Sequence, residues 1–141
     1  MNALATLLPN KPSLHMIQRL EAALRDAPQL DVEPVHHFAP GVYLRELTIP
    51  ADAIVVGKLH RHAHMIMLLS GDVTIYTDEG MKRISGATVW YSSPGTKRVI
   101  YAHEESRLLT VHANATNETD MIVLETEIIE PEVNLLQEDA P

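Results

Sequence analysis

The spacing of apolar residues near the N-terminus predicts one amphipathic helix, over residues 13–27. Apolar side chains recur there at roughly helical spacing, at Leu14, Ile17, Leu20 and Leu24. Ser13 can cap the start of this helix, and Pro28 ends it. We expect the helix to pack against a core or a second subunit and to carry no chemistry itself.

From Val42 onward the pattern changes to short strands, rich in β-branched and aromatic residues and separated by turns. The predicted strands are 42–48, 53–59, 60–70, 73–77, 81–85, 87–91, 98–102 and 107–112. Turn signals near positions 71, 80, 86 and 95 have the short, regular spacing of a β-sandwich or barrel. Residues 121–129 suit either a short helix or a strand. The fold class is therefore mainly β, with an N-terminal helix.

The length of 141 residues, 45% of them hydrophobic, is that of one compact domain. We expect an N-terminal helix and extended arm over 1–41 and a barrel over 42–112. A C-terminal loop, a short helix or strand and an acidic tail follow over 113–141. No apolar run approaches the length of a membrane span, and the start of the chain has no positively charged leader. A cytoplasmic protein that does not bind membranes is the expectation.

The net charge of −8 is confined to the end of the chain, because 8 acidic and no basic residues lie from Glu118 onward. A neutral body with an acidic tail argues against a nucleic acid polymer as partner, since phosphates are neutralised by a basic face. The absence of cysteine excludes disulfides, thiolate metal sites and cysteine nucleophiles. No Gly-rich phosphate loop or dinucleotide fingerprint is present.

Three histidines at alternate positions, His60, His62 and His64, are the sharpest local feature. On an extended strand all three project to one face. Strand positions i and i+2 are about 7 Å apart, so two neighbouring rings can share an ion. Positions i and i+4 are about 13 Å apart, so the rings of His60 and His64 cannot share one unless the strand bends. A metal site would then need a ligand from another strand, for which the candidates are His103, His112, Glu104 and Glu105. Alternatively, the three imidazoles line a polar pocket without metal.

The segment 94–105 forms a second cluster of candidate residues. On a strand that starts at Arg98, Ile100 shares the face of Arg98, while Tyr101 and His103 share the other. Arg98 and His103 therefore do not both face a barrel interior unless a bulge intervenes. An inward Arg98 suits recognition of a carboxylate or phosphate, whereas an outward one pairs with Glu104 or its neighbour.

The segments 57–71 and 86–112 resemble the two motifs of the cupin superfamily. The resemblance implies a small barrel of the double-stranded β-helix (jelly-roll) type, with any metal near its mouth. His60 and His62 match the histidine pair of the first motif. His64 stands where that motif has a glutamate, and Arg98 stands where the second has its last histidine, which makes an anion pocket more credible.

A closer resemblance extends from about residue 28 to 112. The segments 36–41, 43–46, 94–98 and 101–104 are similar to small cupin-like proteins encoded by tailed bacteriophages. This similarity implies a fold rather than an activity. It would place a phage-encoded protein in the host cytoplasm.

The first functional hypothesis is a metal-dependent cupin enzyme acting on a small anionic molecule. A divalent metal (Fe, Mn, Ni or Zn) would be held by His60, His62, His64 and His103. Glu104 or Glu105 would be the general base, and Arg98 would anchor the substrate.

The second hypothesis is a binding module that captures a small anionic, nucleotide-like ligand without turnover. Arg98 and Lys97 would hold the anion, and Trp90, Tyr91 or Tyr101 would stack on a base. The third is a structural protein whose histidines are incidental. A homodimer is expected under each of the three.

Overall fold

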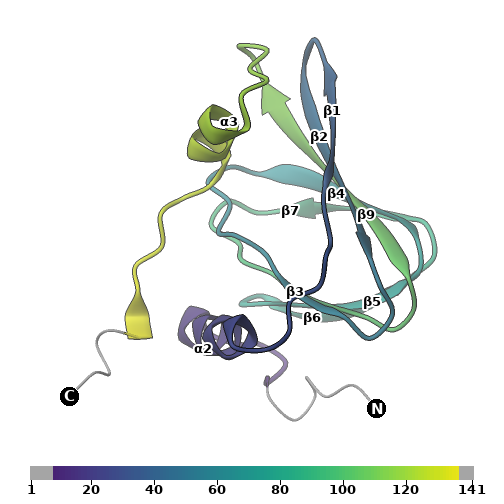
Figure 1. The fold of residues 1–141 in the computed structure, drawn as a ribbon, viewed down its shortest axis with the longest axis vertical. Helices are drawn as coiled ribbons and strands as arrows, with labels where there is room; N and C mark the ends of the chain where they lie inside the picture. The colour runs from purple at the N-terminus through teal and green to yellow at the C-terminus, as the bar shows by residue number, and fades with distance from the viewer. Residues whose placement is uncertain (1–7, 137–141) are drawn as a thin grey trace.

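The protein consists of two antiparallel β-sheets that pack face to face, with one helix against the smaller sheet and another beside the barrel (Figure 1). The computed structural model describes residues 8–136. The five-stranded sheet has the order β1–β2–β9–β4–β7, and the four-stranded sheet has the order β3–β8–β5–β6. The strands are β1 Val35–Ala39, β2 Gly41–Ile49, β3 Ile54–Val56, β4 His64–Ser70, β5 Asp72–Thr77, β6 Gly80–Ser85, β7 Thr88–Ser92, β8 Val99–Ala102 and β9 Ser106–Asn114. The predicted mainly β fold class is confirmed.

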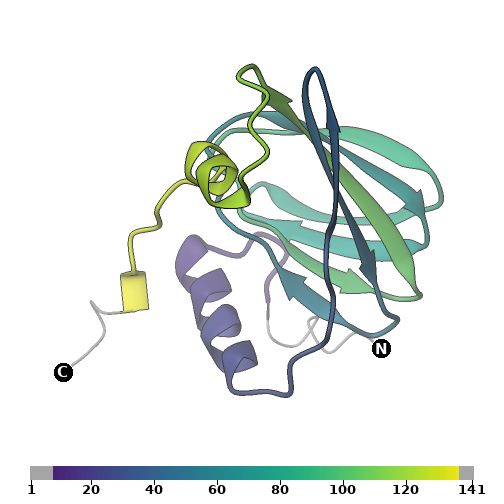
Figure 2. The same cartoon turned by 45° about the horizontal axis from the view of Figure 1, so that its top comes forward.

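The predicted N-terminal helix is also confirmed, as α2 (Leu14–Arg25). Its N-cap is Ser13, whose hydroxyl accepts a hydrogen bond from the backbone N–H of Met16 at 3.2 Å. The buried face of α2 packs on the outer side of the smaller sheet (Figure 2). This second core contains Leu8, Ile17, Leu20, Tyr76, Val99 and Tyr101.

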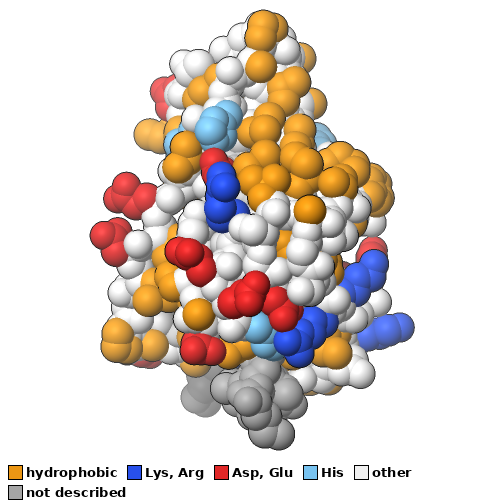
Figure 3. All heavy atoms as spheres, turned by 90° about the vertical axis from the view of Figure 1, so that its right-hand side faces the viewer, with side chains coloured by type: hydrophobic (Ala, Val, Ile, Leu, Met, Phe, Trp, Pro, Cys, Tyr) orange, Lys and Arg blue, Asp and Glu red, His pale blue; other side chains and the backbone are white. Residues whose placement is uncertain are grey.

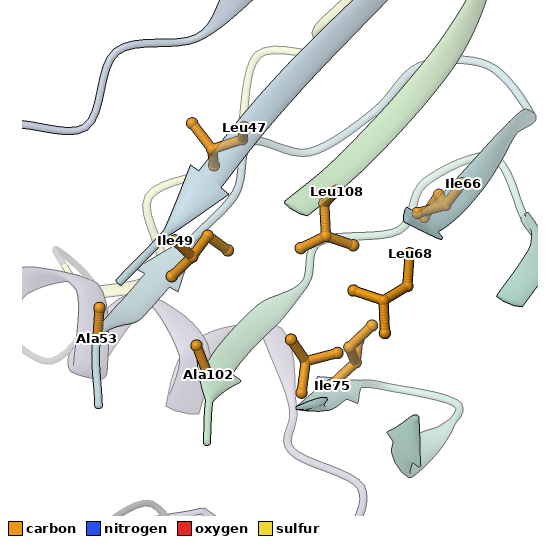
Figure 4. Close-up of a cluster of buried hydrophobic side chains, with 9 residues drawn as sticks. Leu47, Ile49, Ala53, Ile66, Leu68, Ile75, Ala102 and Leu108 are labelled. Carbon is orange, nitrogen blue, oxygen red and sulfur yellow. The ribbon is translucent and has the colours of Figure 1, made fainter. Parts of the chain in front are cut away.

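The main core lies between the two sheets, where alternate residues of facing strands point inward (Figure 4). Ile49 from β2, Leu68 from β4 and Val73 from β5 are at most 1% exposed. These side chains fill one end of the barrel. The other end is hollow and carries the candidate site.

Two local predictions need correction, and one alternative that the sequence left open is decided. The expected strand 60–70 begins only at His64, because residues 61–63 form a bend and a short loop. The arm before residue 42 contains a strand, β1, which pairs with β2. The ambiguous segment 121–129 is a helix, α3 (Met121–Ile128), whose N-cap Asp120 accepts a hydrogen bond from the backbone N–H of Ile122 at 2.9 Å. In the part of the chain that the structure describes, no helix is long and apolar enough to cross a membrane.

Hydrophobic side chains gather over the upper half of the face shown in Figure 3. The five-stranded sheet exposes apolar residues on β4 and β7, on the side turned away from the core. These are Met65, Leu69, Val89 and Tyr91. Contiguous exposed apolar surface of this kind marks interaction sites in soluble proteins.

The homodimer expected from the sequence stays a prediction, which this surface makes testable. If a second copy covers β7, Val89→Glu should convert a dimer into a monomer of 15.7 kDa in light scattering after size exclusion. A charge buried in an apolar contact without a partner is costly. Met81→Glu, at an exposed position on β6, is the matched control and should stay dimeric. A monomeric wild type, or a dimeric Val89→Glu variant, would contradict the prediction.

Candidate functional site

A cavity of about 590 Å³ opens at the hollow end of the barrel, between the two sheets. Its inner wall is apolar and includes Leu47, Ile66, Ile75, Ile100 and Leu108. Residues of α3 form one side of its mouth, with Met121, Ile122 and Glu125 among them. The cavity is thus an apolar chamber with polar groups in its lining, among them His60, Arg98 and His112.

Three imidazoles converge beside the cavity: those of His60 and His112, which line it, and that of His64. The ring centroids of His60 and His64 are 4.4 Å apart, those of His64 and His112 4.8 Å, and those of His60 and His112 5.7 Å. His64 and His112 meet because β4 and β9 are antiparallel neighbours, with Met65 opposite Val111. His60 comes from the connection between β3 and β4.

A turn, rather than a strand, brings His60 beside His64. The backbone N–H of His60 donates to the carbonyl of Thr96 at 3.1 Å, and the carbonyl of His60 accepts from Gly95 at 2.8 Å. The next N–H, of Arg61, donates to the carbonyl of Ile128 in α3 at 2.8 Å. The expectation that three alternate imidazoles project together is therefore wrong, since the chain is not extended there. His62 is exposed and lies outside the cluster.

The guanidinium of Arg98 completes the cluster and is only 7% exposed. Its Nη1 donates to the hydroxyl of Ser92 at 2.9 Å and lies 3.3 Å from Nε2 of His64. Ser92 and His64 are directly opposite each other on β7 and β4, so both face Arg98. Among the described residues, no carboxylate forms a salt bridge with Arg98. The prediction that Arg98 and Ile100 share one face is confirmed, and this face, which the sequence did not assign to either side, lines the cavity.

The environment keeps the imidazoles neutral. Burial, together with repulsion by Arg98, lowers the pKa of His60 and His112 to about 3 and that of His64 to about 4. Since a guanidinium only donates, Nε2 of His64 is the acceptor, and Nδ1 donates to the carbonyl of His62 at 3.2 Å. Burial and repulsion by Arg45 lower the pKa of Arg98 to about 10, so Arg98 remains charged at neutral pH.

Of the other residues predicted to bind a ligand, only Trp90 lines the cavity. Tyr101 faces α2, and its hydroxyl donates to Asp52 at 2.7 Å. Lys97 is 3% exposed and is held by two carboxylates outside the cavity. Both residues therefore belong to the packing of the helix and termini against the smaller sheet.

The remaining candidates lie at the opposite end of β8 from Arg98. Strand β8 separates Arg98 from His103 by about 16 Å, at 3.3 Å per residue. Nε2 of His103 lies 2.6 Å from the hydroxyl of Thr74. Glu104 and Glu105 are exposed in the turn that follows. The structure thus does not bring His103, Glu104 or Glu105 into contact with the histidine cluster.

No protein-family model matches the chain, and no curated protein matches it. Solved structures do. Ectoine synthase from P. lautus superposes with a TM-score of 0.56 at 16% identity, covering 77% of this chain and 80% of that one. An RmlC-like cupin from Shewanella frigidimarina gives a TM-score of 0.53 at 12% identity over 67% of this chain and 89% of that one. The chain has a cupin fold. KdgF from Halomonas sp. is also similar, with a TM-score of 0.52 at 13% identity over 64% and 83%. At these identities the cupin likeness is one of fold alone.

Because cupin folds often bind metals, the three imidazoles need to be tested as a ligand set. Both ring nitrogens of His64 already have partners, and one of these partners is a cation. Nε2 of His112 lies 2.9 Å from the hydroxyl of Thr110. Within residues 8–136 no group of three or more His, Asp or Glu side chains is arranged to hold a metal ion. The donor set of this cupin cavity therefore does not fit a metal.

Sequence reasoning named His112 as one of several possible ligands but favoured His103. The alternation along β9 could have decided between them. A charged Arg107 points outward, so Leu108, Thr110 and His112 point inward. The contributions of Ser92 and α3 gave no comparable signal in the sequence.

Proposed function

We propose that the cavity binds a small molecule that has one anionic group and an apolar body. The observation that carries this proposal is the buried guanidinium of Arg98, which forms no ion pair with a described carboxylate. Burying an uncompensated charge costs free energy, and an anionic ligand group would offset that cost. A carboxylate or phosphate also suits the fork of guanidinium donors.

The charges around the cavity support an anion. Three further basic side chains line it, those of Arg45, Lys58 and Arg61, against a single acidic one, that of Glu125. This excess of positive charge lies in a protein whose net charge is −8. A cleft lined by one sign of charge concentrates the oppositely charged ligand.

The apolar wall supports a ligand body larger than a free inorganic ion. A volume of about 590 Å³ lies within the common range for small-molecule sites, about 300–1,000 Å³. Trp90 offers a flat surface on which a ring can stack. The neutral imidazoles add hydrogen-bonding groups, among them Nδ1 of His60, which is buried and has no partner among the described residues.

Arg98→Met provides the test. A thermal-shift screen would compare aromatic and aliphatic carboxylates and nucleoside monophosphates, each with its uncharged amide or nucleoside. The anions should raise the melting temperature of the wild type, and the uncharged analogues should not. Calorimetry with the strongest anion should show a loss of at least about 30-fold in affinity in Arg98→Met, since the partner of a buried charge is removed.

The unliganded variant is its own folding control. Removing an unpaired buried charge should leave the melting temperature of Arg98→Met equal to or above that of the wild type. Lys82→Met, at an exposed lysine on β6, controls for the loss of one positive charge. A wild type that responds to no anion, or a variant that binds the anion equally well, would overturn the proposal.

A further inference from the structure

We infer that Arg98 replaces a metal ion as the fixed cation of this cupin site, so that Arg98→His alone would turn the histidine cluster into a metal site. This inference concerns the same cavity as the proposed function. It does not depend on an anion being bound, and its test uses metal ions only.

The cluster combines three potential metal ligands with one resident cation. Three imidazoles from three separate segments face one another, with centroids 4.4–5.7 Å apart. Three nitrogen ligands with one open position is the usual layout of a catalytic metal site. What distinguishes this cluster is the fourth member, a guanidinium that can donate hydrogen bonds but cannot ligate a metal.

The guanidinium of Arg98 lies where a metal ion would bind His64. Nη1 of Arg98 is 3.3 Å from Nε2 of His64, on the lone pair that a metal would need at about 2.0–2.1 Å. A second cation cannot use the same lone pair, and it would meet the full charge of Arg98 at short range. Nη1 is also held by the hydroxyl of Ser92 at 2.9 Å. Arg98 therefore blocks the metal both sterically and electrostatically.

One imidazole of the cluster, that of His64, already has its orientation and tautomer fixed. The neutral imidazoles offer lone pairs, and the Nδ1–H of His64 is fixed by the carbonyl of His62, which leaves Nε2 as the acceptor. Such a carbonyl is a common orienting partner of metal-bound histidine. Replacing Arg98 by histidine removes the resident charge and adds a fourth imidazole from the same backbone position.

The experiment compares metal binding by five chelator-treated proteins: the wild type, His64→Ala, Arg98→His and two double variants. Binding is followed by the visible absorption of Co²⁺ and by equilibrium dialysis with Zn²⁺. The wild type should hold no stoichiometric metal at 10-fold excess over about 10 μM protein. Arg98→His should bind one equivalent and show a nitrogen-ligated Co²⁺ spectrum. Arg98→His combined with His64→Ala should lose it, whereas Arg98→His combined with His62→Ala should keep it, because His62 is exposed.

A wild type that binds one equivalent and loses it on His64→Ala would overturn the inference. So would a folded Arg98→His variant, verified by circular dichroism, that binds no metal. These results are separate from those of the anion screen. If no anion stabilises the wild type but the cobalt results are as expected, only the proposal of anion binding is rejected. If the wild type binds both an anion and cobalt, only the inference that Arg98 replaces a metal is rejected.

Discussion

Lowering the pH from 7.5 to 5 is expected to destabilise the folded protein by about 4–6 kcal/mol. Burial keeps the pKa of His60 and His112 at about 3 and that of His64 at about 4. In the unfolded chain each imidazole titrates near 6.5. Between these values the unfolded state binds protons that the folded state does not, so stability falls as the pH falls. Each histidine contributes about 2 kcal/mol at pH 5, so the three together contribute at most about 6 kcal/mol.

Urea unfolding at pH 7.5, 6.5, 5.5 and 5.0 would measure this loss. The range stays above the usual carboxyl pKa of about 4, so acidic residues contribute little to it. His112→Gln should reduce the loss by about one third, because one titrating group is removed. His62→Gln, at an exposed position, should leave it unchanged. A free energy of unfolding that is constant between pH 7.5 and 5 would show that the imidazoles are not buried as described.

The sequence was sufficient to predict what depends on local periodicity. The N-cap at Ser13 follows from spacing, and the shared face of Arg98 and Ile100 follows from alternation; both are found in the structure. Alternation left open whether that face points into the barrel. Counting from the turn at Gly71 singled out His64, and counting from Gly95 singled out Arg98. The structure places these two side chains in contact. Half of the site was therefore accessible from local pattern and resemblance.

The other half depends on contacts between distant parts of the chain. The turn that brings His60 to His64 is held by the loop at Gly95 and by α3, which lie more than 30 residues away. Alternation cannot describe such a segment, so His62 was grouped with the others. The same limit applies to α3 itself. Its residues suited a strand as well as a helix, and docking beside the barrel places them at the mouth of the cavity.

The prediction that Lys97 binds a ligand arose because its partners are distant in the sequence and alternation does not reveal them. Its Nζ lies 3.1 Å from Glu21 of α2 and 2.9 Å from Glu132 of the C-terminal segment, 76 and 35 residues away. Gln18 adds a hydrogen bond to Glu132 at 3.2 Å. This buried cluster fastens α2 and the C-terminal segment to the barrel.

Lys97→Met is expected to lower the free energy of unfolding by about 3 kcal/mol, because it leaves two carboxylates facing each other without their shared cation. Burial raises the pKa of Glu132, but hydrogen bonds from Lys97 and Gln18 lower it below its usual value. Without Lys97 that pKa should rise, so the deficit should shrink as the pH falls from 7 to 4.5 and Glu132 becomes protonated. Urea unfolding of the variant and the wild type at both pH values measures this.

Charge matching gives the decisive control for Lys97. Adding Glu21→Gln and Glu132→Gln to Lys97→Met should recover most of the lost stability, since neutral amides can remain buried beside each other at lower cost than carboxylates. Lys82→Met removes an exposed lysine and should have an effect within about 0.5 kcal/mol. If Lys97→Met were as stable as the wild type, Lys97 would not be fastening these segments. A ligand-binding role for Lys97 would then again be open to test.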